Sequence, residues 1–292
     1  MLDEAERTMV NLLRGEAGTV EGERFSYIGE NANLNKTERA ALNMAKQMEL
    51  EGETAMDIRW QTGWFRGTDG KWRMEVDDSV VEYFPNGDAR GAAPGQGTKV
   101  RDFIRHPQLE RLEPDIFDLP MQIDPAMKPG TNGQYDGRSR GISVRDGAAL
   151  STVLHEIQHG IQEIEGFARG SSLDEGKKWA MLVAYEQVKD TPEYQQLQNS
   201  DARFQYVQNK AMEIARMQKL EDAGIIYYAN AAGEVEARDT ANRANLTAFE
   251  RSGQKPDLSG NARYGESSFL DYVDMLRDMG YANSEILERI RL

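Results

Sequence analysis

The clearest periodic pattern in the chain is a stripe of apolar residues between positions 146 and 165. Its members recur every three to four residues, which is the period of one face of a helix. We therefore predict a helix that begins at a cap on Asp146, runs to about Glu165 and ends at Gly166, since glycine readily takes up the left-handed conformation that closes helices. The stripe consists of Leu150, Val153, Leu154, Ile157, Ile161 and Ile164.

Helical periodicity also recurs on both sides of this segment. The helix predicted at 36–51 has an expected cap at Asn35 or Thr37, because the side-chain oxygen of either residue can accept a hydrogen bond from the first turn. The predicted helices cover residues 2–14, 36–51, about 173–223 with a break near Pro192, 231–238, about 266–278 and 284–290.

The strand signals lie ahead of the central helix. Residues 58–76 form two aromatic, β-rich arms around the turn signal Asp69-Gly70, and we expect their tryptophans in the core. Residues 116–124 and 140–144 read as further strands, whereas 129–139 reads as a turn region. Val100 to Leu109 predicts a short helix ended by His106-Pro107, with His106 structural, and the Gly-rich residues 85–98 predict a loop and candidate lid. Together these elements predict a mostly helical α+β fold with a small twisted sheet before the central helix.

Composition narrows the kind of partner. The 292 residues carry a net charge of −14, which disfavours nucleic acid and anionic membranes as partners. The N-terminal residues lack the apolar core of a signal peptide, and no segment approaches 18 consecutive apolar residues. The chain also has no cysteine, which fits a reducing compartment. We therefore expect a cytoplasmic protein.

The central helix carries an H-E-x-x-H motif, His155-Glu156-Ile157-Gln158-His159. Residues four apart share a helix face, so both imidazoles can bind one metal ion. Glu156 would project beside them as the general base. We therefore predict a site for one zinc ion, with His155 and His159 as ligands and, in the absence of cysteine, His or carboxylate oxygen for the rest.

The third ligand has three candidates. Metzincin-type peptidases place it six residues after the second histidine, which is Glu165 here, but Gln162 stands where they need a glycine. Gluzincins take a glutamate from a later helix, and Gly233–Arg238 supplies one. Two acids at i and i+2 point to different faces, so only one can be a ligand. We favour Glu234, keep Glu236 as the alternative and rank Glu165 last.

Peptide hydrolysis also needs a donor for the developing oxyanion. Tyr227, Tyr228 and Arg238 lie near the proposed third ligand in sequence and are candidates for this role or for supporting the ligands. The strand at 140–144 is a candidate to bind an extended peptide along its edge.

Several stretches resemble the zincin-like metallopeptidase domains of large polyvalent proteins from phages and conjugative elements. The matching pieces are Thr62–Gly67 with Asp69–Glu75, His106-Pro107 with Leu109, Leu154–His159 running on to Gln162 and Glu165–Gly170, and Gly233–Arg238 with Arg243. The resemblance implies a phage or mobile-element origin, compatible with delivery into a host cell. It also implies a zincin-like fold, a zinc-dependent peptidase and a site that includes Gly233–Arg238. We accordingly expect an N-terminal helical segment at 1–52, the zincin-like domain at 53–255 and a helical tail at 256–292.

Two functions remain open from the sequence. The first is a zinc-dependent metallopeptidase that hydrolyses peptide bonds of a peptide or protein substrate with a metal-activated water and Glu156 as general base. The alternative is a zinc-stabilised binding or structural module of a phage polyvalent protein without peptidase activity. Glu156 favours the enzyme, because a structural zinc site has no need of a general base.

Overall fold

The computed structural model describes residues 25–78, 80–89, 98–128, 131–217, 223–243, 256–262 and 269–290. The helix expected at 2–14 and most of the loop expected at 85–98 lie outside these residues. The chain divides into two compact units, unit 1 with the residues up to Phe167 and Glu236–Asp257, and unit 2 with Ala168–Val235 and the residues from Leu258 onward. Helices combine with small sheets, as the predicted α+β class requires. The predicted boundaries after residues 52 and 255 stay a prediction.

Unit 1 contains an antiparallel sheet of order β1-β3-β2. The predicted turn at Asp69-Gly70 is confirmed, and Gly70 adopts a positive φ of 74° there. The first arm is shorter than predicted, because residues 55–62 form a helix that closes at Gly63 in the left-handed conformation. The elements are β1 (Phe25–Ile28), α3 (Ala55–Thr62), β2 (Trp64–Arg66) and β3 (Trp72–Asp77).

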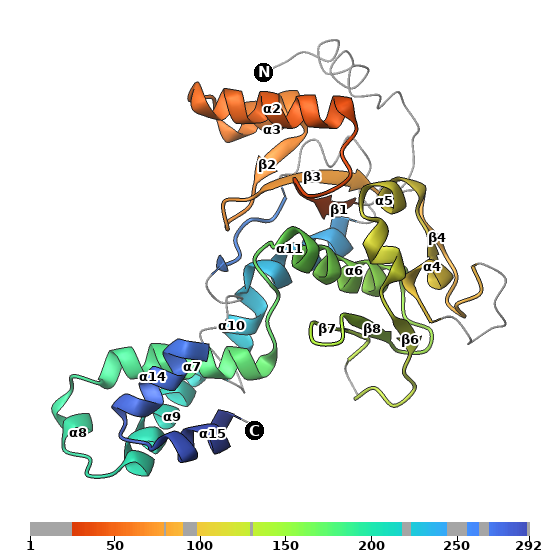
Figure 1. The fold of residues 1–292 in the computed structure, drawn as a ribbon. Helices are drawn as coiled ribbons and strands as arrows, with labels where there is room; N and C mark the ends of the chain where they lie inside the picture. The colour runs from red at the N-terminus through yellow and green to blue at the C-terminus, as the bar shows by residue number, and fades with distance from the viewer. Residues whose placement is uncertain are drawn as a thin grey trace. The chain divides into compact units, whose positions relative to one another are not determined.

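Helices α2 (Lys36–Leu50) and α3 cover one face of this sheet (Figure 1). Asn35 caps α2 as expected, accepting from the backbone of Glu38, whose side chain accepts from the backbone of Asn35 in return. Trp64 and Trp72 pack with Leu42 and Met48 of α2 in one apolar cluster. Both tryptophans are almost fully buried, so the prediction of core residues is confirmed for them, whereas Trp60 in the same stretch is only partly buried.

Helix α6 (Leu150–Glu165) is the central predicted helix, and it packs against both sheets of unit 1 (Figure 1). Its apolar residues share one cluster with Val76 of the first sheet and Ile142 of the second. The helix ends at Gly166, with φ of 63°, as predicted. It begins after Ala149 rather than at Asp146, so that the predicted cap was wrong.

The second sheet has the order β6-β8-β7 and precedes α6 in the chain. Strand β8 is central, pairing with β6 in parallel and with β7 antiparallel. The prediction that residues 140–144 offer a free edge to a peptide was therefore wrong, because both edges of β8 are already paired. Strand β7 falls in a region predicted as turn. The strands are β6 (Met121–Ile123), β7 (Gly133–Asp136) and β8 (Gly141–Val144).

In the segment that connects the two sheets, the structure differs from the prediction at His106. This residue caps the start of a helix instead of ending one, because its Nδ1 accepts from the backbone N–H of Leu109 at 3.3 Å. Its Nε2 lies 2.7 Å from Oδ1 of Asp78, and both side chains are fully buried, which confirms the structural role. The elements are β4 (Glu82–Tyr83), α4 (Val100–Phe103), β5 (Ile104–Arg105), α5 (Pro107–Leu112) and the 3₁₀ helix η1 (Pro114–Asp118).

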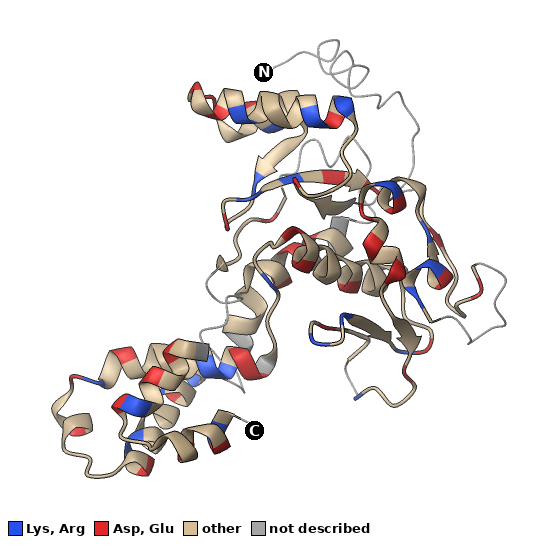
Figure 2. Cartoon of the chain, in the orientation of Figure 1, with Lys and Arg blue, Asp and Glu red and all other residues tan. Residues whose placement is uncertain are grey.

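Unit 2 is helical, with an apolar core contributed mainly by α7, α9, α14 and α15. Within the described residues, no helix is long and apolar enough to cross a membrane. Acidic and basic side chains are interspersed along the elements of both units (Figure 2). The helices are α7 (Leu173–Val188), α8 (Pro192–Gln195), α9 (Ser200–Met217), α10 (Ile225–Asn230), α14 (Phe269–Asp278) and α15 (Asn283–Ile290), and α11 (Ala232–Arg243) begins in unit 2 and ends in unit 1.

Candidate metal centre

The two histidines of α6 turn the same nitrogen toward each other. Nε2 of His155 and Nε2 of His159 are 3.2 Å apart, and the ring planes are nearly perpendicular at 87°. Two nitrogen ligands that bind one tetrahedral zinc at about 2.0–2.1 Å are separated by about 3.3 Å. The spacing of the two imidazoles thus matches the separation that zinc demands.

The favoured third ligand, Glu234, lies in the first turn of helix α11. This is one continuous helix, so Glu234 is positioned by the turns that follow it, in which Ala237 and Arg238 interact with His155. Residues three and four apart share a helix face, which places Glu234 on the same face as these two. His155 and His159 belong to unit 1 and Glu234 to unit 2, so Glu234 as the third ligand stays a prediction. Two imidazoles and one carboxylate form a donor set suited to zinc.

The environment of His155 favours its neutral form. Burial lowers the pKa of its imidazole to about 3, electrostatic repulsion from the neighbouring imidazole of His159 and from Arg238 acts in the same direction, and a hydrogen bond with the backbone of Ala237 partly opposes them. Since a metal binds the unprotonated nitrogen, this side chain does not have to lose a proton at neutral pH before it binds an ion.

Glu156 lies beside strand β7, buried to 6% exposure. Gly133, the first residue of that strand, lies next to its carboxylate, because an added Cβ there would come within 2.6 Å of Oε1 of Glu156 and 2.7 Å of Cγ2 of Thr152. The missing side chain at position 133 therefore makes room for the carboxylate. Sequence reasoning assigned residue 133 to a turn and did not find this contact.

The substitution Gly133→Ala tests how closely Glu156 is held. We expect a strong loss of any hydrolytic activity and a loss of stability of about 1–3 kcal/mol, because the new methyl group would force the carboxylate to move. Activity and thermal unfolding should be measured together with zinc content, which we expect to stay unchanged. Gly137→Ala is the matched control, because its Cβ would meet Glu163 at a tolerable 3.4 Å. Equal effects of the two substitutions would contradict a specific role of Gly133.

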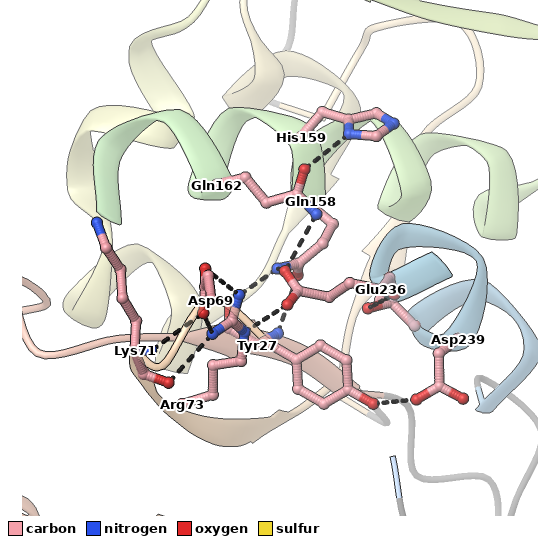
Figure 3. Close-up of polar contacts among 10 residues, drawn as sticks. Tyr27, Asp69, Lys71, Arg73, Gln158, His159, Gln162, Glu236 and Asp239 are labelled. Atoms are coloured by element: carbon pink, nitrogen blue, oxygen red, sulfur yellow. Dashed lines mark hydrogen bonds and ion pairs between the residues drawn. The ribbon is translucent and has the colours of Figure 1, made fainter. Parts of the chain in front are cut away.

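Glu236 is held by three donors from outside its own helix (Figure 3). Its Oε1 accepts from Nε2 of Gln158 and Nε2 of Gln162, each at 3.0 Å, and its Oε2 accepts from Nε of Arg73. Both oxygens of this alternative ligand are thus engaged with protein groups.

Glu165 is engaged at the far end of α6. Its Oε2 accepts from the backbone N–H of Asn31 at 2.9 Å. Its carboxyl group also faces Glu113, and burial together with this second carboxyl group raises the pKa of Glu113 well above the usual range. This third candidate ligand therefore belongs to a buried carboxyl pair.

The candidate oxyanion donors belong to different units of the chain. Arg238 lies on the part of α11 in unit 1, where its charge acts on His155. Tyr227 and Tyr228 lie on α10 of unit 2, and Tyr227 packs against the apolar core of that unit. The roles of all three residues as donors stay predictions.

Sequence reasoning missed the roles of Arg73, Gln158 and Gln162, which all donate to Glu236, while Gln162 also contacts His159. A signal for the two glutamines was present in the sequence. Gln158 and Gln162 are four residues apart, like the histidines, so that all four side chains form one continuous polar face of the helix. Both glutamines are almost fully buried, which the apolar stripe alone did not predict.

Comparison with known families gives one match, to large polyvalent protein associated domain 23, over residues 25–83. This segment covers the first sheet with α2 and α3, and ends at β4. It supports the predicted association with large polyvalent proteins. No curated protein and no solved structure matches the chain.

Proposed function

We propose that the chain is a zinc-dependent metallopeptidase with a zincin-like fold, in which His155, His159 and Glu234 hold one zinc ion. The observation that carries the proposal is the 3.2 Å approach of the two Nε2 atoms on a helix that also bears a buried glutamate between them in sequence. When bound, zinc would polarise the scissile carbonyl and lower the pKa of a water to about 7.

Glu156 would act as the general base. A carboxylate at this position can accept a proton from the attacking water and deliver it to the nitrogen of the leaving amine. Its pocket beside Gly133 keeps the side chain in a restricted space, which limits the orientations that the carboxylate can adopt.

Strand β7 supports a peptide as the substrate. It pairs with β8 on one side, and β7 starts at the glycine that contacts Glu156. An extended peptide added to the other side of β7 would form main-chain hydrogen bonds and run past the general base. In this proposal, β7 binds the peptide along its edge, in place of residues 140–144.

A binding module without peptidase activity is the second candidate. The match of residues 25–83 to a domain associated with large polyvalent proteins favours it, because such a domain can serve as one part of a longer assembly. A zinc ion would then mainly hold α6 and α11 in place.

Metal analysis and a cleavage assay on the purified chain test the proposal. We expect about one zinc per chain and cleavage of a peptide library that stops after chelation and returns with zinc. Failure to bind zinc even after its addition would refute the metal site. Zinc binding without cleavage of any library member would favour the binding module.

A further inference from the structure

A line of buried and partly buried hydrogen bonds joins His159 to strand β3 (Figure 3). Nδ1 of His159 lies 2.9 Å from Oε1 of Gln162, and Nε2 of Gln162 donates to Oε1 of Glu236 at 3.0 Å. The other oxygen of Glu236 accepts from Nε of Arg73, and Nη1 and Nη2 of Arg73 donate to Oδ1 and Oδ2 of Asp69 at 2.7 and 2.9 Å. Five side chains from three elements and a hairpin turn therefore form one continuous path.

The chemistry of the end groups fixes the direction of every bond in this path. Arg73 can only donate, and a carboxylate can only accept. Glu236 must therefore receive the amide N–H of Gln162, which leaves the amide oxygen of Gln162 to face the imidazole. Because that oxygen is an acceptor, Nδ1 of His159 has to carry the proton, and the lone pair of the neutral ring is then on Nε2.

The path is anchored against rotation. Gln158 donates to the same oxygen of Glu236 and also binds the backbone of Tyr27, accepting from its N–H at 2.9 Å and donating to its carbonyl at 3.0 Å. The Arg73 side chain is 2% exposed, and its guanidinium lies 3.9 Å from the ring centre of Phe167. Burial lowers the pKa of Arg73, but the carboxylates of Glu236 and Asp69 outweigh it and raise the pKa above its ordinary value. The donor at the end of the path thus stays charged.

We infer that Gln162 and Glu236 are positioning residues that hold His159 in the tautomer with a proton on Nδ1, so that its Nε2 lone pair points toward Nε2 of His155. Glu236, the alternative ligand of the sequence, then supports a ligand instead of binding the ion. The tautomer itself requires no metal, while its value for zinc affinity rests on the proposed function.

Imidazole ¹⁵N NMR of the metal-free protein reads the tautomer directly. The chain has only three histidines, so that His155→Gln and His106→Asn suffice to assign the spectrum. We expect His159 to show a protonated Nδ1 and an unprotonated Nε2. A protonated Nε2 on His159 in the folded wild-type protein would overturn the inference, whether or not the protein binds zinc.

Two substitutions break the path at different points. In Glu236→Gln the acceptor becomes an amide that can present either end, and in Gln162→Met the acceptor for the imidazole is lost. Both should give His159 a mixture of tautomers and weaken zinc binding about 10- to 100-fold, as is usual for partners of metal ligands. Glu75→Gln is the matched control. Glu75 lies on β3, as Arg73 does, but its partly buried ion pair with Arg59 of α3 is not part of the path.

The backbone NMR spectrum shows whether each variant is folded, and Gln162→Met carries the test if Glu236→Gln does not fold. A wild-type tautomer in folded Gln162→Met would overturn the inference. Protonated Nδ1 in a wild-type protein that binds no zinc would instead leave the hydrogen-bond path intact and refute the proposed function.

Discussion

Replacing Glu156 with glutamine is expected to lower peptidase activity about 100- to 10,000-fold while zinc remains bound, because a general base contributes on this order and an amide cannot accept the proton. The two side chains have nearly the same shape, and Glu156 is 6% exposed, so the substitution fits the existing space beside Gly133. Initial rates of peptide cleavage and zinc per chain should be measured on the same preparations.

Glu163→Gln is the control for this prediction. Glu163 lies on the same helix, and its carboxylate accepts from the hydroxyl of Tyr135 at 3.0 Å and pairs with Arg140 at 3.2 Å, without a described contact to the histidines. We expect it to keep the wild-type rate. Undiminished cleavage by Glu156→Gln would show that this residue is no general base, and parallel loss in both variants would point to a general effect on the helix.

Replacing Glu234 with glutamine is expected to weaken zinc binding at least about 100-fold, which exceeds the usual effect of a residue behind a ligand. A neutral amide oxygen is a poorer ligand for zinc than a carboxylate, and the substitution leaves only the two imidazoles. Competition with a chromogenic chelator measures the affinity without any assay of cleavage. Melting in the presence of excess chelator shows whether the metal-free variant is still folded.

The three candidate acids should separate in this measurement. Glu165→Gln should retain wild-type affinity, since its carboxylate binds the backbone of Asn31 and faces Glu113. Glu236→Gln should fall between the other two, as a support for His159. The assignment of Glu234 as a ligand would be refuted if its variant bound zinc as tightly as the Glu165 variant.

Local sequence signals were sufficient for several features that depend on neighbouring residues, although the cap expected at Asp146 was wrong. The cap at Asn35, the turn at Asp69-Gly70 and the helix end at Gly166 were all predicted correctly, because each depends on hydrogen bonds or backbone angles within a few residues. The spacing of His155 and His159 also belongs to this class, since one helical turn is enough to bring their nitrogens together.

Predictions failed where a segment depends on a distant partner. Residues 133–136 read as a turn, yet they form a strand because β8 offers them an antiparallel partner. His106 was expected to end a helix and instead begins one, held in place by Asp78, which lies 28 residues earlier. Such pairings are invisible to the pattern of a single segment.

The sequence by itself determined that one helix carries two imidazoles and a carboxylate on adjoining faces, because helical geometry relates residues four apart wherever the helix lies. It also limited the third ligand to a few acids, but two acids that are two residues apart on α11 look alike in sequence. Only the tertiary structure decided that Glu236 meets Arg73, Gln158 and Gln162, because these partners come from 74 to 163 residues away and their positions depend on how α6 packs between the sheets.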